Sequence, residues 1–370
     1  MKDCLLEGSL VHPMSPVEEE TEIPSCWRVG VHTSIAGSLA QAAEKAHQIG
    51  CTAFQIFSTS PRMWKARPLG QEEISSMARL RSEYDLHPLV IHANYLLNLA
   101  SPDPALRERS IAAFREELGR ASALGAQYLV LHPGSYRDAT PEQGIRTLAR
   151  SIHEAMGREA MRHEAMGREA MQETPPHGVR PDGVRLLIEN TCGQGNTLGG
   201  SFAEIQEILA LLEGLPVDCC LDTAHCFAAG MNVATPEGLQ KALAEVDATV
   251  GLQRVKVIHA NDSRSALGSH RDWHEHIGRG GIGLEGFRRI VNDPGLRDKV
   301  FILETPVDKP GDDQRNLRML QSLRSAGSGA AFFSTAGGRR ETRTVRGRER
   351  AARPQRGSTP ERIRHAAGAR

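Results

Sequence analysis

A short stretch of the sequence, GSHRDWHEHIGRGGIG, holds three histidines and an aspartate, all able to bind a metal ion, within seven positions. They are His270, Asp272, His274 and His276, and glycines follow them closely. Imidazole nitrogens and carboxylate oxygens are ligands that Zn²⁺, Mn²⁺ and Fe²⁺ accept. A solvated loop can also carry histidines without energetic cost, so this stretch alone leaves two interpretations open, a metal site and a polar loop.

Residues of the same types recur at the ends of short apolar runs. Eight runs have the composition of buried parallel strands; they are RVGVH, AFQIF, PLVIHA, YLVLHPG, RLLIENT, VDCCLDTAH, VKVIHAND and VFILET. Seven of them end in a residue that could bind metal: His32, His92, His132, Glu189, Asp222 with His225 beyond it, His259 with Asp262 beyond it, and Glu304.

These residues favour metal binding when they are considered together. A single histidine after an apolar strand is more often a hydrogen-bonded core residue than a ligand. A buried ring of carboxylates and imidazoles would be prohibitively costly unless cations compensated its charge. One ion takes three or four protein ligands, and about eight or more are available here, which is enough for two or three ions. Two ions roughly 3.5 to 4 Å apart are the usual arrangement for displacement at phosphorus.

The apolar runs alternate with helical patterns, and this alternation predicts a (β/α)₈ barrel. Residues 39–49 have apolar side chains at helical spacing, and Gly50 follows as a terminator. Thr140 and Thr235 each precede Pro-Glu, which is a helix start, and a capping box begins at Ser201. An open doubly wound sheet fits less well, because no Gly-x-Gly-x-x-Gly follows the first strand. In a barrel, the carboxyl ends of all strands meet at one mouth, where we expect the chemistry.

The composition is that of a globular protein, with 39% hydrophobic and 24% charged residues in a chain of 370. No apolar run approaches eighteen residues, and the start, MKDCLLEGSLVHPM, lacks the features of a secretory signal. The seven cysteines contain no CxxC pair and predict no disulfide framework. We expect a cytoplasmic protein that acts as a monomer, without a membrane span or an obligate protein partner.

Three segments depart from the barrel pattern. Residues 1–27 are acidic and aperiodic, and they predict a flexible leader ahead of a barrel domain at 28–324. Residues 153–172 are a tandem repeat, HEAMGREAMR and then HEAMGREAMQ, inserted on the face opposite the expected mouth. Residues 325–370 are rich in Arg, Gly and Ala and predict a disordered tail. Such a tail could attract nucleic acid through its charge, although a solvated extension without function is the plainer interpretation.

Six motifs resemble, in order, those of the endonuclease IV family, the zinc-dependent apurinic/apyrimidinic endonucleases. They are VIHANYLLNLASP, LVLHPGSY, LLIENTCGQGNTLGG, CLDTAHCFAAG, VIHANDSRSALGSHRDWHEHIGRGGIG and FILETP. The resemblance spans about Val29 to Arg324. It implies a DNA repair enzyme with a (β/α)₈ barrel and three zinc ions, for which manganese could substitute. The implied reaction is hydrolysis of the phosphodiester bond 5′ to an abasic site in duplex DNA, which leaves 3′-hydroxyl and 5′-deoxyribose phosphate ends.

The resemblance also implies roles for nine residues, all of which have the expected type. The three zinc sets would be His92, His132 and Glu189; Glu189, Asp222, His259 and Glu304; and His225, Asp272 and His274. Three Zn²⁺ against the four carboxylates leave a charge of +2, which would attract a phosphodiester. Glu304 would orient or deprotonate the attacking water, with Glu189 as the second catalytic residue. His270 and His276 would stay outside the ligand sets, beside them or in solvent.

The resemblance places Arg62 and Tyr95 on loops that would enter the DNA duplex and fill the gap left by the missing base. Their alternative roles are an exposed arginine and a packed tyrosine, and Trp64 is expected to pack. Two positions depart from the family pattern: Trp273 stands where arginine is common, and Arg279 where an acid is common. These changes could alter contacts to the DNA backbone or the substrate preference.

Two other functions remain as alternatives. A sugar isomerase or epimerase of the xylose isomerase-like barrels would use one or two ions and the four residues Glu189, Asp222, His259 and Glu304. It would have no use for the remaining five ligand candidates. A damage-binding protein that has lost catalysis is the second alternative, and the full set of ligands argues against it.

Overall fold

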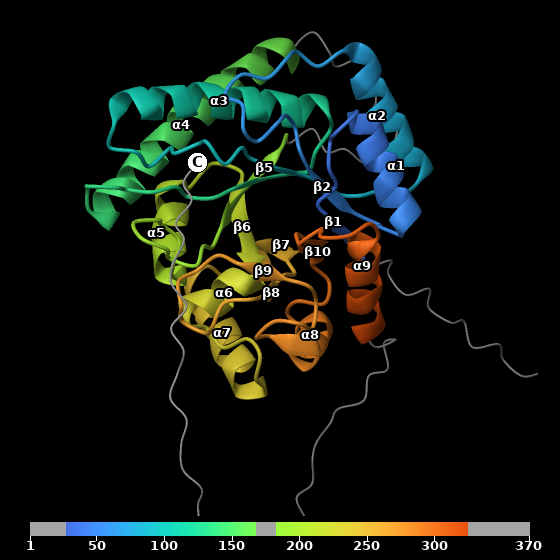
Figure 1. The fold of residues 1–370 in the computed structure, drawn as a ribbon. Coiled ribbons are helices and arrows are strands. Elements are labelled where there is room, and N and C mark those ends of the chain that lie inside the picture. The colour runs from blue at the N-terminus through green and yellow to red at the C-terminus, as the bar shows by residue number, and fades with distance from the viewer. Residues whose placement is uncertain (1–26, 168–182, 325–370) are drawn as a thin grey trace, which may run out of the picture. The chain divides into compact units, whose positions relative to one another are not determined.

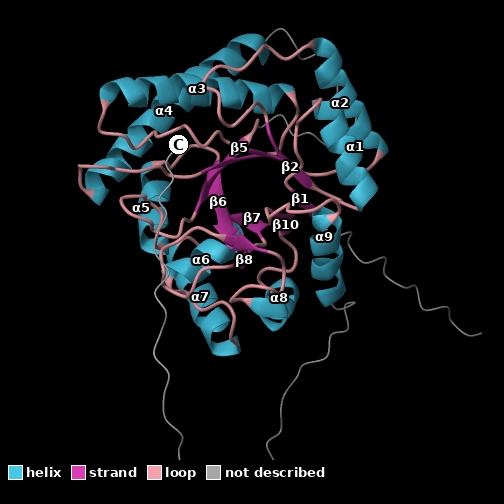
Figure 2. Cartoon of the chain, in the orientation of Figure 1, coloured by secondary structure: helices cyan, strands magenta, loops and turns pink. Residues whose placement is uncertain are grey.

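The computed structural model describes residues 27–167 and 183–324, and its strands form a ring that helices surround (Figures 1 and 2). Residues 1–26 of the expected leader, residues 168–172 of the tandem repeat and the tail at 325–370 lie outside the described residues. Among the residues that are described, no helix combines the length and the apolar character needed to cross a membrane.

Eight parallel strands form the ring, as predicted. Their order is β1-β10-β7-β6-β5-β4-β3-β2, and they are β1 (Val29–Val31), β2 (Phe54–Phe57), β3 (Leu89–His92), β4 (Tyr128–Leu131), β5 (Arg185–Glu189), β6 (Val217–Asp222), β7 (Val255–His259) and β10 (Val300–Leu303). A parallel bridge between His32 and Gln55 joins β1 to β2. Gly30 permits this close approach, because a Cβ there would lie 1.7 Å from the carbonyl oxygen of Ala53.

Helices follow the strands and cover the outside of the ring. They are α1 (Leu39–Ile49), α2 (Gln71–Glu83), α3 (Pro104–Ala123), α4 (Pro141–Gly167), α5 (Phe202–Leu211), α6 (Thr223–Ala229), α7 (Pro236–Thr249), α8 (Gly283–Asn292) and α9 (Asp312–Leu323). The predicted caps of α5 and α7 are present, since Ser201 and Thr235 each accept a hydrogen bond from a backbone N–H of the first turn, and Ser38 caps α1 in the same way. The Glu204 carboxylate instead accepts from Gly199 and Gly200, so the capping box is only half formed.

One buried layer of side chains explains how the strands position the candidate ligands. It includes one residue from each of seven strand segments: Ala53, Val90, Val130, Leu187, Cys220, Val257 and Ile302. Since side chains alternate between the two faces of a strand, the next positions on the same face lie two residues later. These are Gln55, His92, His132, Glu189, Asp222, His259 and Glu304. The barrel therefore carries a hydrophobic layer directly beneath a polar layer at its mouth.

Two of the apolar runs continue past their barrel strand into another helix or strand. The run VDCCLDTAH is not a continuous strand, because β6 ends at Asp222 and α6 begins at Thr223. The Asp222 carboxylate accepts a hydrogen bond from the backbone N–H of His225, 2.7 Å away, and so caps this short helix. The run VKVIHAND ends as a barrel strand at His259, and Asp262–Ser263 forms the separate strand β8, which pairs with β9 (His274–Glu275).

Candidate metal centre

Glu189, at the end of β5, lies between three of the predicted histidine ligands. Its Oε2 atom is 3.0 Å from Nε2 of His132 and 3.4 Å from Nε2 of His92. Its Oε1 atom is 2.9 Å from Nδ1 of His259. The ligand atoms of His92, His132 and Glu189 all lie within 4.8 Å of one another. A fully buried carboxylate thus faces one pair of histidines with one oxygen and a third histidine with the other.

A second group of ligand atoms adjoins the first through the same carboxylate. It consists of Glu189, Asp222, His259 and Glu304, whose ligand atoms also lie within 4.8 Å of one another. Nδ1 of His259 is 3.3 Å from Oε2 of Glu304. The geometry therefore permits Glu189 to take part in two ion sites at once.

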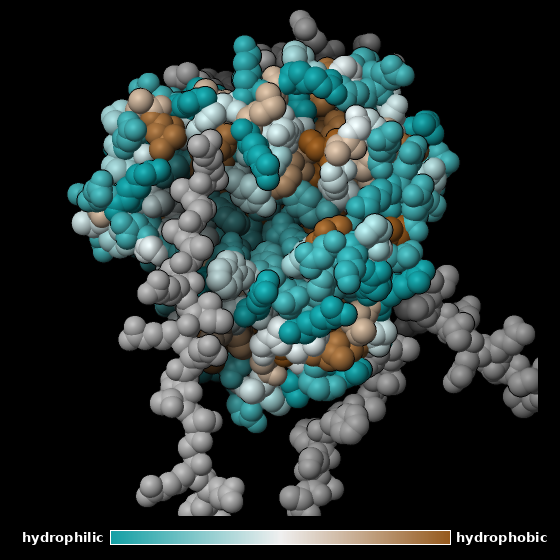
Figure 3. Space-filling view, in the orientation of Figure 1, coloured by the Kyte–Doolittle hydropathy of each residue, from teal (hydrophilic) through white to brown (hydrophobic). Residues whose placement is uncertain are grey.

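Ligand atoms of Asp222, His225 and His274 lie within 4.8 Å of one another, and Asp272, the remaining member of the third predicted group, lies beside the two histidines. Oδ1 of Asp272 is 3.1 Å from Nε2 of His225 and 3.3 Å from Nε2 of His274. Asp222 is close to this group as well, because its Oδ2 is 3.8 Å from Nε2 of His274. The structure thus brings all nine predicted ligand residues together at the mouth, which is a hydrophilic hollow in the space-filling view (Figure 3).

The ring orientations of the histidines are those of metal ligands. Nδ1 of His92, His225 and His274 lies 2.8, 2.9 and 3.1 Å from the backbone carbonyl oxygens of Ala93, Asn190 and Glu304, respectively. A hydrogen bond from Nδ1–H to a carbonyl leaves the Nε2 lone pair directed into the site, which is how most metal-binding histidines are held. In each of the three, Nε2 faces a carboxylate oxygen. A nitrogen lone pair and a carboxylate oxygen both accept hydrogen bonds, so a proton or a cation must lie between them.

Unsatisfied buried atoms at the mouth fit a bound cation. Oε2 of Glu189 and Nε2 of His274 are buried and lack a well-aligned hydrogen bond. Burial alone would raise the pKa of Glu189, but the charges of His259 and His132 outweigh it and hold the pKa well below its usual value. Burial would lower the pKa of His225, but Asp222 and Asp272 raise it well above its usual value. Protons stabilise this cluster without metal, and metal binding at neutral pH would release them.

The structure gives His270 and His276 structural roles outside the three groups. His270 is exposed, and its Nδ1 lies 2.7 Å from the carbonyl oxygen of Cys192. His276 is buried rather than solvated, and the amide of Asn316 on α9 donates a hydrogen bond of 2.9 Å to its Nδ1. Its Nε2 is 3.4 Å from Oδ2 of the exposed Asp308. Both ring nitrogens of His276 therefore have partners.

Gln55 is a site residue that the motifs do not identify. Its side chain is fully buried on β2. Its Nε2 donates to Oε1 of Glu304 at 2.6 Å, and its Oε1 accepts from Nε2 of His259 at 2.9 Å. Nε2 of Gln55 also lies 3.0 Å from Nδ1 of His32. The amide donates to the carboxylate and accepts from the imidazole at the same time, and this pairing directs Nδ1 of His259 toward Glu189.

We expect the substitution Gln55→Met to lower the affinity for zinc by about 10- to 100-fold, the usual cost of losing a hydrogen bond that orients a ligand. Methionine has a similar length but can neither donate to Glu304 nor accept strongly from His259. The measurement is competition for zinc with a chromophoric chelator, and Gln71→Met on the exposed surface of α2 is the control. Gln55→Glu should not restore the affinity, because it places a second carboxylate against Glu304. An unchanged affinity in Gln55→Met would remove Gln55 from the site.

The glycine-rich end of the opening stretch wraps around a buried carboxylate. Asp262 accepts hydrogen bonds from the backbone N–H groups of Gly278, Gly280, Ile282 and Gly283 at 2.9 to 3.2 Å. A Cβ on Gly280 would lie 2.4 Å from the carbonyl oxygen of Ser263, so only glycine fits there. GRGGIG is therefore a close-approach loop, and N–H groups in and beside it bind a carboxylate of the same chain.

The two predicted DNA-contacting residues lie on neighbouring loops. Tyr95, after β3, is 61% exposed, and its ring centroid is 5.5 Å from that of His92. Arg62, after β2, is exposed. The Asn94 side chain joins the loops by donating to the carbonyl oxygens of Ser60 and Met63. Trp64 is partly buried against the core, with Cζ of Arg109 4.2 Å from its ring centroid, and it packs as expected.

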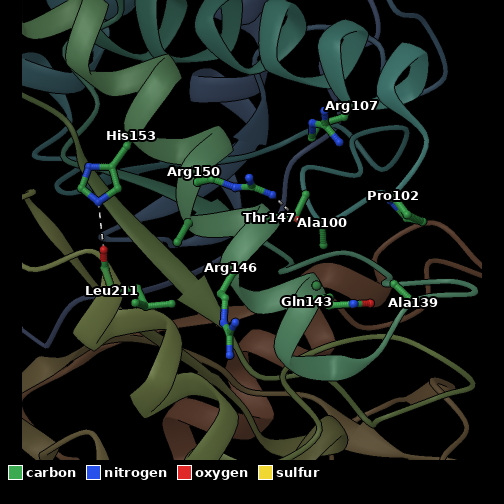
Figure 4. Close-up of a pocket in the computed structure, with 12 residues that line it drawn as sticks. Ala100, Pro102, Arg107, Ala139, Gln143, Arg146, Thr147, Arg150, His153 and Leu211 are labelled. Carbon is green, nitrogen blue, oxygen red and sulfur yellow. Dashed lines mark hydrogen bonds between the residues drawn. The ribbon is translucent and has the colours of Figure 1, made fainter.

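A separate cavity of about 740 Å³ lies on the flank of the barrel, between α3, α4 and the end of α5 (Figure 4). Its lining includes Arg107, Arg146 and Arg150, which point in different directions, and none of the nine ligand candidates. The groups capable of metal chemistry therefore lie at the barrel mouth, away from this cavity.

Known proteins match most of the chain. The family model described as a xylose isomerase-like TIM barrel matches residues 43–325. A protein named probable endonuclease 4 from Solibacter usitatus is 50% identical over 299 residues, which cover 80% of this chain and 96% of that protein. The crystal structure of endonuclease IV from Thermus thermophilus is 40% identical with a TM-score of 0.66, over 80% of this chain and 98% of that one. A D-tagatose 3-epimerase-like protein, 18% identical over 80% of this chain and 96% of its own with a TM-score of 0.56, has a similar fold. The chain belongs to the endonuclease IV family, within the xylose isomerase-like TIM barrels.

Proposed function

We propose that the protein is a DNA repair endonuclease that hydrolyses the phosphodiester bond 5′ to abasic sites in duplex DNA, leaving 3′-hydroxyl and 5′-deoxyribose phosphate ends. The observation that carries this proposal is the convergence of nine ligand side chains in three adjoining groups, in a chain of the endonuclease IV family. All nine come from one chain, within residues 28–324, which supports a catalytic domain that acts as a monomer.

We assign the three groups to three zinc ions, because their nitrogen and oxygen donors and their number of ligands suit zinc. Zinc bound there would make water a nucleophile at neutral pH and would neutralise charge on the phosphate. Glu304 is the residue of the chain placed to accept a proton from the attacking water, since it ends β10 at the mouth and its side chain is 13% exposed. Gln55 and Asn261 hold its two carboxylate oxygens through hydrogen bonds of 2.6 and 3.4 Å.

We assign recognition of the abasic site to Arg62 and Tyr95. A missing base removes much of the pairing and stacking that keeps a nucleotide inside the helix. An exposed aromatic ring and an arginine on adjoining loops are suited to occupy the vacated space. The rings of Tyr95 and His132 have centroids 6.5 Å apart, so a nucleotide displaced beside Tyr95 would reach the ligand groups directly.

The sugar isomerase alternative uses only part of this site. It accounts for Glu189, Asp222, His259 and Glu304, but the histidines at 92, 132, 225 and 274 and Asp272 would have no role in it. The likeness to the epimerase-like structure is at 18% identity and concerns the fold alone.

Incision of a defined duplex tests the proposal. A duplex with one tetrahydrofuran abasic analogue should be cut once, on the 5′ side, and the new 3′ end should be extendable by a DNA polymerase because it carries a hydroxyl. The matched duplex without the lesion should stay intact. Binding without incision would favour a damage-binding protein, and interconversion of ketohexoses without incision would favour the isomerase.

A further inference from the structure

Trp273 is an exposed aromatic side chain on the loop that carries two candidate ligands. It lies between Asp272 and His274 and is 56% exposed. The other tryptophans pack against the core, with arginine guanidinium carbons 4.5 Å from the ring of Trp27 and 4.2 Å from the ring of Trp64. An exposed indole presents an apolar face on which another aromatic ring can stack.

Two exposed arginines lie next to Trp273, one through its side chain and one through its backbone. Cζ of Arg271 lies 5.7 Å from the ring centroid of Trp273, and the backbone N–H of Arg264 donates to the carbonyl oxygen of Trp273 at 2.9 Å. Within the described part of the chain, neither arginine is within 4 Å of a carboxylate. An aromatic ring with unpaired arginines beside it is the composition of surfaces that stack on nucleobases and bind phosphates.

A series of neighbouring histidine rings connects Tyr95 with the loop that carries Trp273. Ring centroids are 6.5 Å apart between Tyr95 and His132, 5.7 Å between His132 and His225, and 5.6 Å between His225 and His274, the residue after Trp273. A duplex whose gap is filled from the side of Tyr95 would therefore meet Trp273 across the metal centre.

We propose that Trp273 stacks on the base opposite the abasic gap, while Arg264 and Arg271 bind phosphates of the strand that carries this base. This inference rests on the proposed function. The opposite base has lost its pairing partner, so it costs less to unstack than any paired base. Stacking on an indole suits all four bases, so the contact adds affinity for the lesion without a preference for the opposing base.

The test compares incision of two duplexes that differ only in the opposite strand. In one, adenine faces the tetrahydrofuran residue of the labelled strand; in the other, a propyl spacer without a base faces it. Trp273→Ala should raise KM about tenfold on the adenine duplex, as the loss of one stacked base predicts, and less than twofold on the spacer duplex. The value of kcat and the zinc content should not change, and Trp273→Phe should restore most of the affinity.

Met319→Ala removes an exposed apolar side chain from α9 and serves as the control, with no change expected on either duplex. Equal increases of KM on both duplexes in Trp273→Ala, or no increase on either, would overturn the stacking contact while leaving the endonuclease function in place. Absence of incision by the unmodified protein would overturn both. Arg264→Ala and Arg271→Ala should each weaken binding to both duplexes. Each should also lower the slope of log affinity against log salt concentration by about one, the loss of one phosphate contact. An unchanged slope would contradict the phosphate contacts.

Discussion

Glu304→Gln should reduce incision by about 10³-fold or more while leaving the barrel folded. The amide has the same shape as the carboxylate but cannot accept a proton from the attacking water, and general base catalysis contributes about 10²- to 10⁴-fold. It also removes a negative ligand beside His259, whose Nδ1 lies 3.3 Å from the carboxylate. The expected loss is therefore in kcat, measured by single-turnover incision at saturating enzyme.

Circular dichroism and the zinc content of the same preparation show whether the variant remains folded and loaded. Glu245→Gln, on the exposed face of α7, is the matched control and should cut at the normal rate. If Glu304→Gln were folded and cut as fast as the unmodified protein, Glu304 would have no part in the mechanism.

Glu189→Gln should have the widest effect on the metal centre. Its carboxylate belongs to two of the three ligand groups and is fully buried. An amide would direct N–H hydrogens at histidine nitrogens that must accept a cation, and it would remove a charge that two ions share. We expect the zinc content to fall from about three ions per chain to about one, and incision to become undetectable, as measured by elemental analysis and the incision assay.

Asp272→Asn provides a comparison within the same site. Among the described residues, Asp272 pairs with His225 and His274 of the third group, and its side chain is 43% exposed. This variant should lose one ion and keep two, whereas Glu189→Gln should lose two. Equal zinc losses in both variants would mean that Glu189 does not bridge, and the division into three groups would be wrong.

The sequence predicts the barrel and the convergence of the ligands for a simple geometric reason. In seven of the eight runs, the inward-facing position at the carboxyl end holds a residue that could bind metal, as in Val257 followed by His259 on β7. In a parallel barrel all such positions meet at one end. Strand composition and alternation thus locate the mouth before any contact is known.

Other features of the site depend on contacts that the sequence pattern does not contain. His225 lies on α6 because Asp222 caps that helix, and a run of apolar residues conceals the change from strand to helix. Gln55 lies on the inward face of its strand, as the ligands do. A glutamine inside the apolar run AFQIF is the signal that could have identified it. The burial of His276 follows from Asn316, forty residues away on α9, and no local pattern predicts such a partner.

The most direct test of the account is a zinc titration of the metal-free protein, followed by incision of the duplex with the tetrahydrofuran residue. Close to three zinc ions should bind per chain, and incision should reach its full rate only as the third site fills. Binding that saturates at one ion per chain, or full incision in the presence of excess chelator, would contradict it.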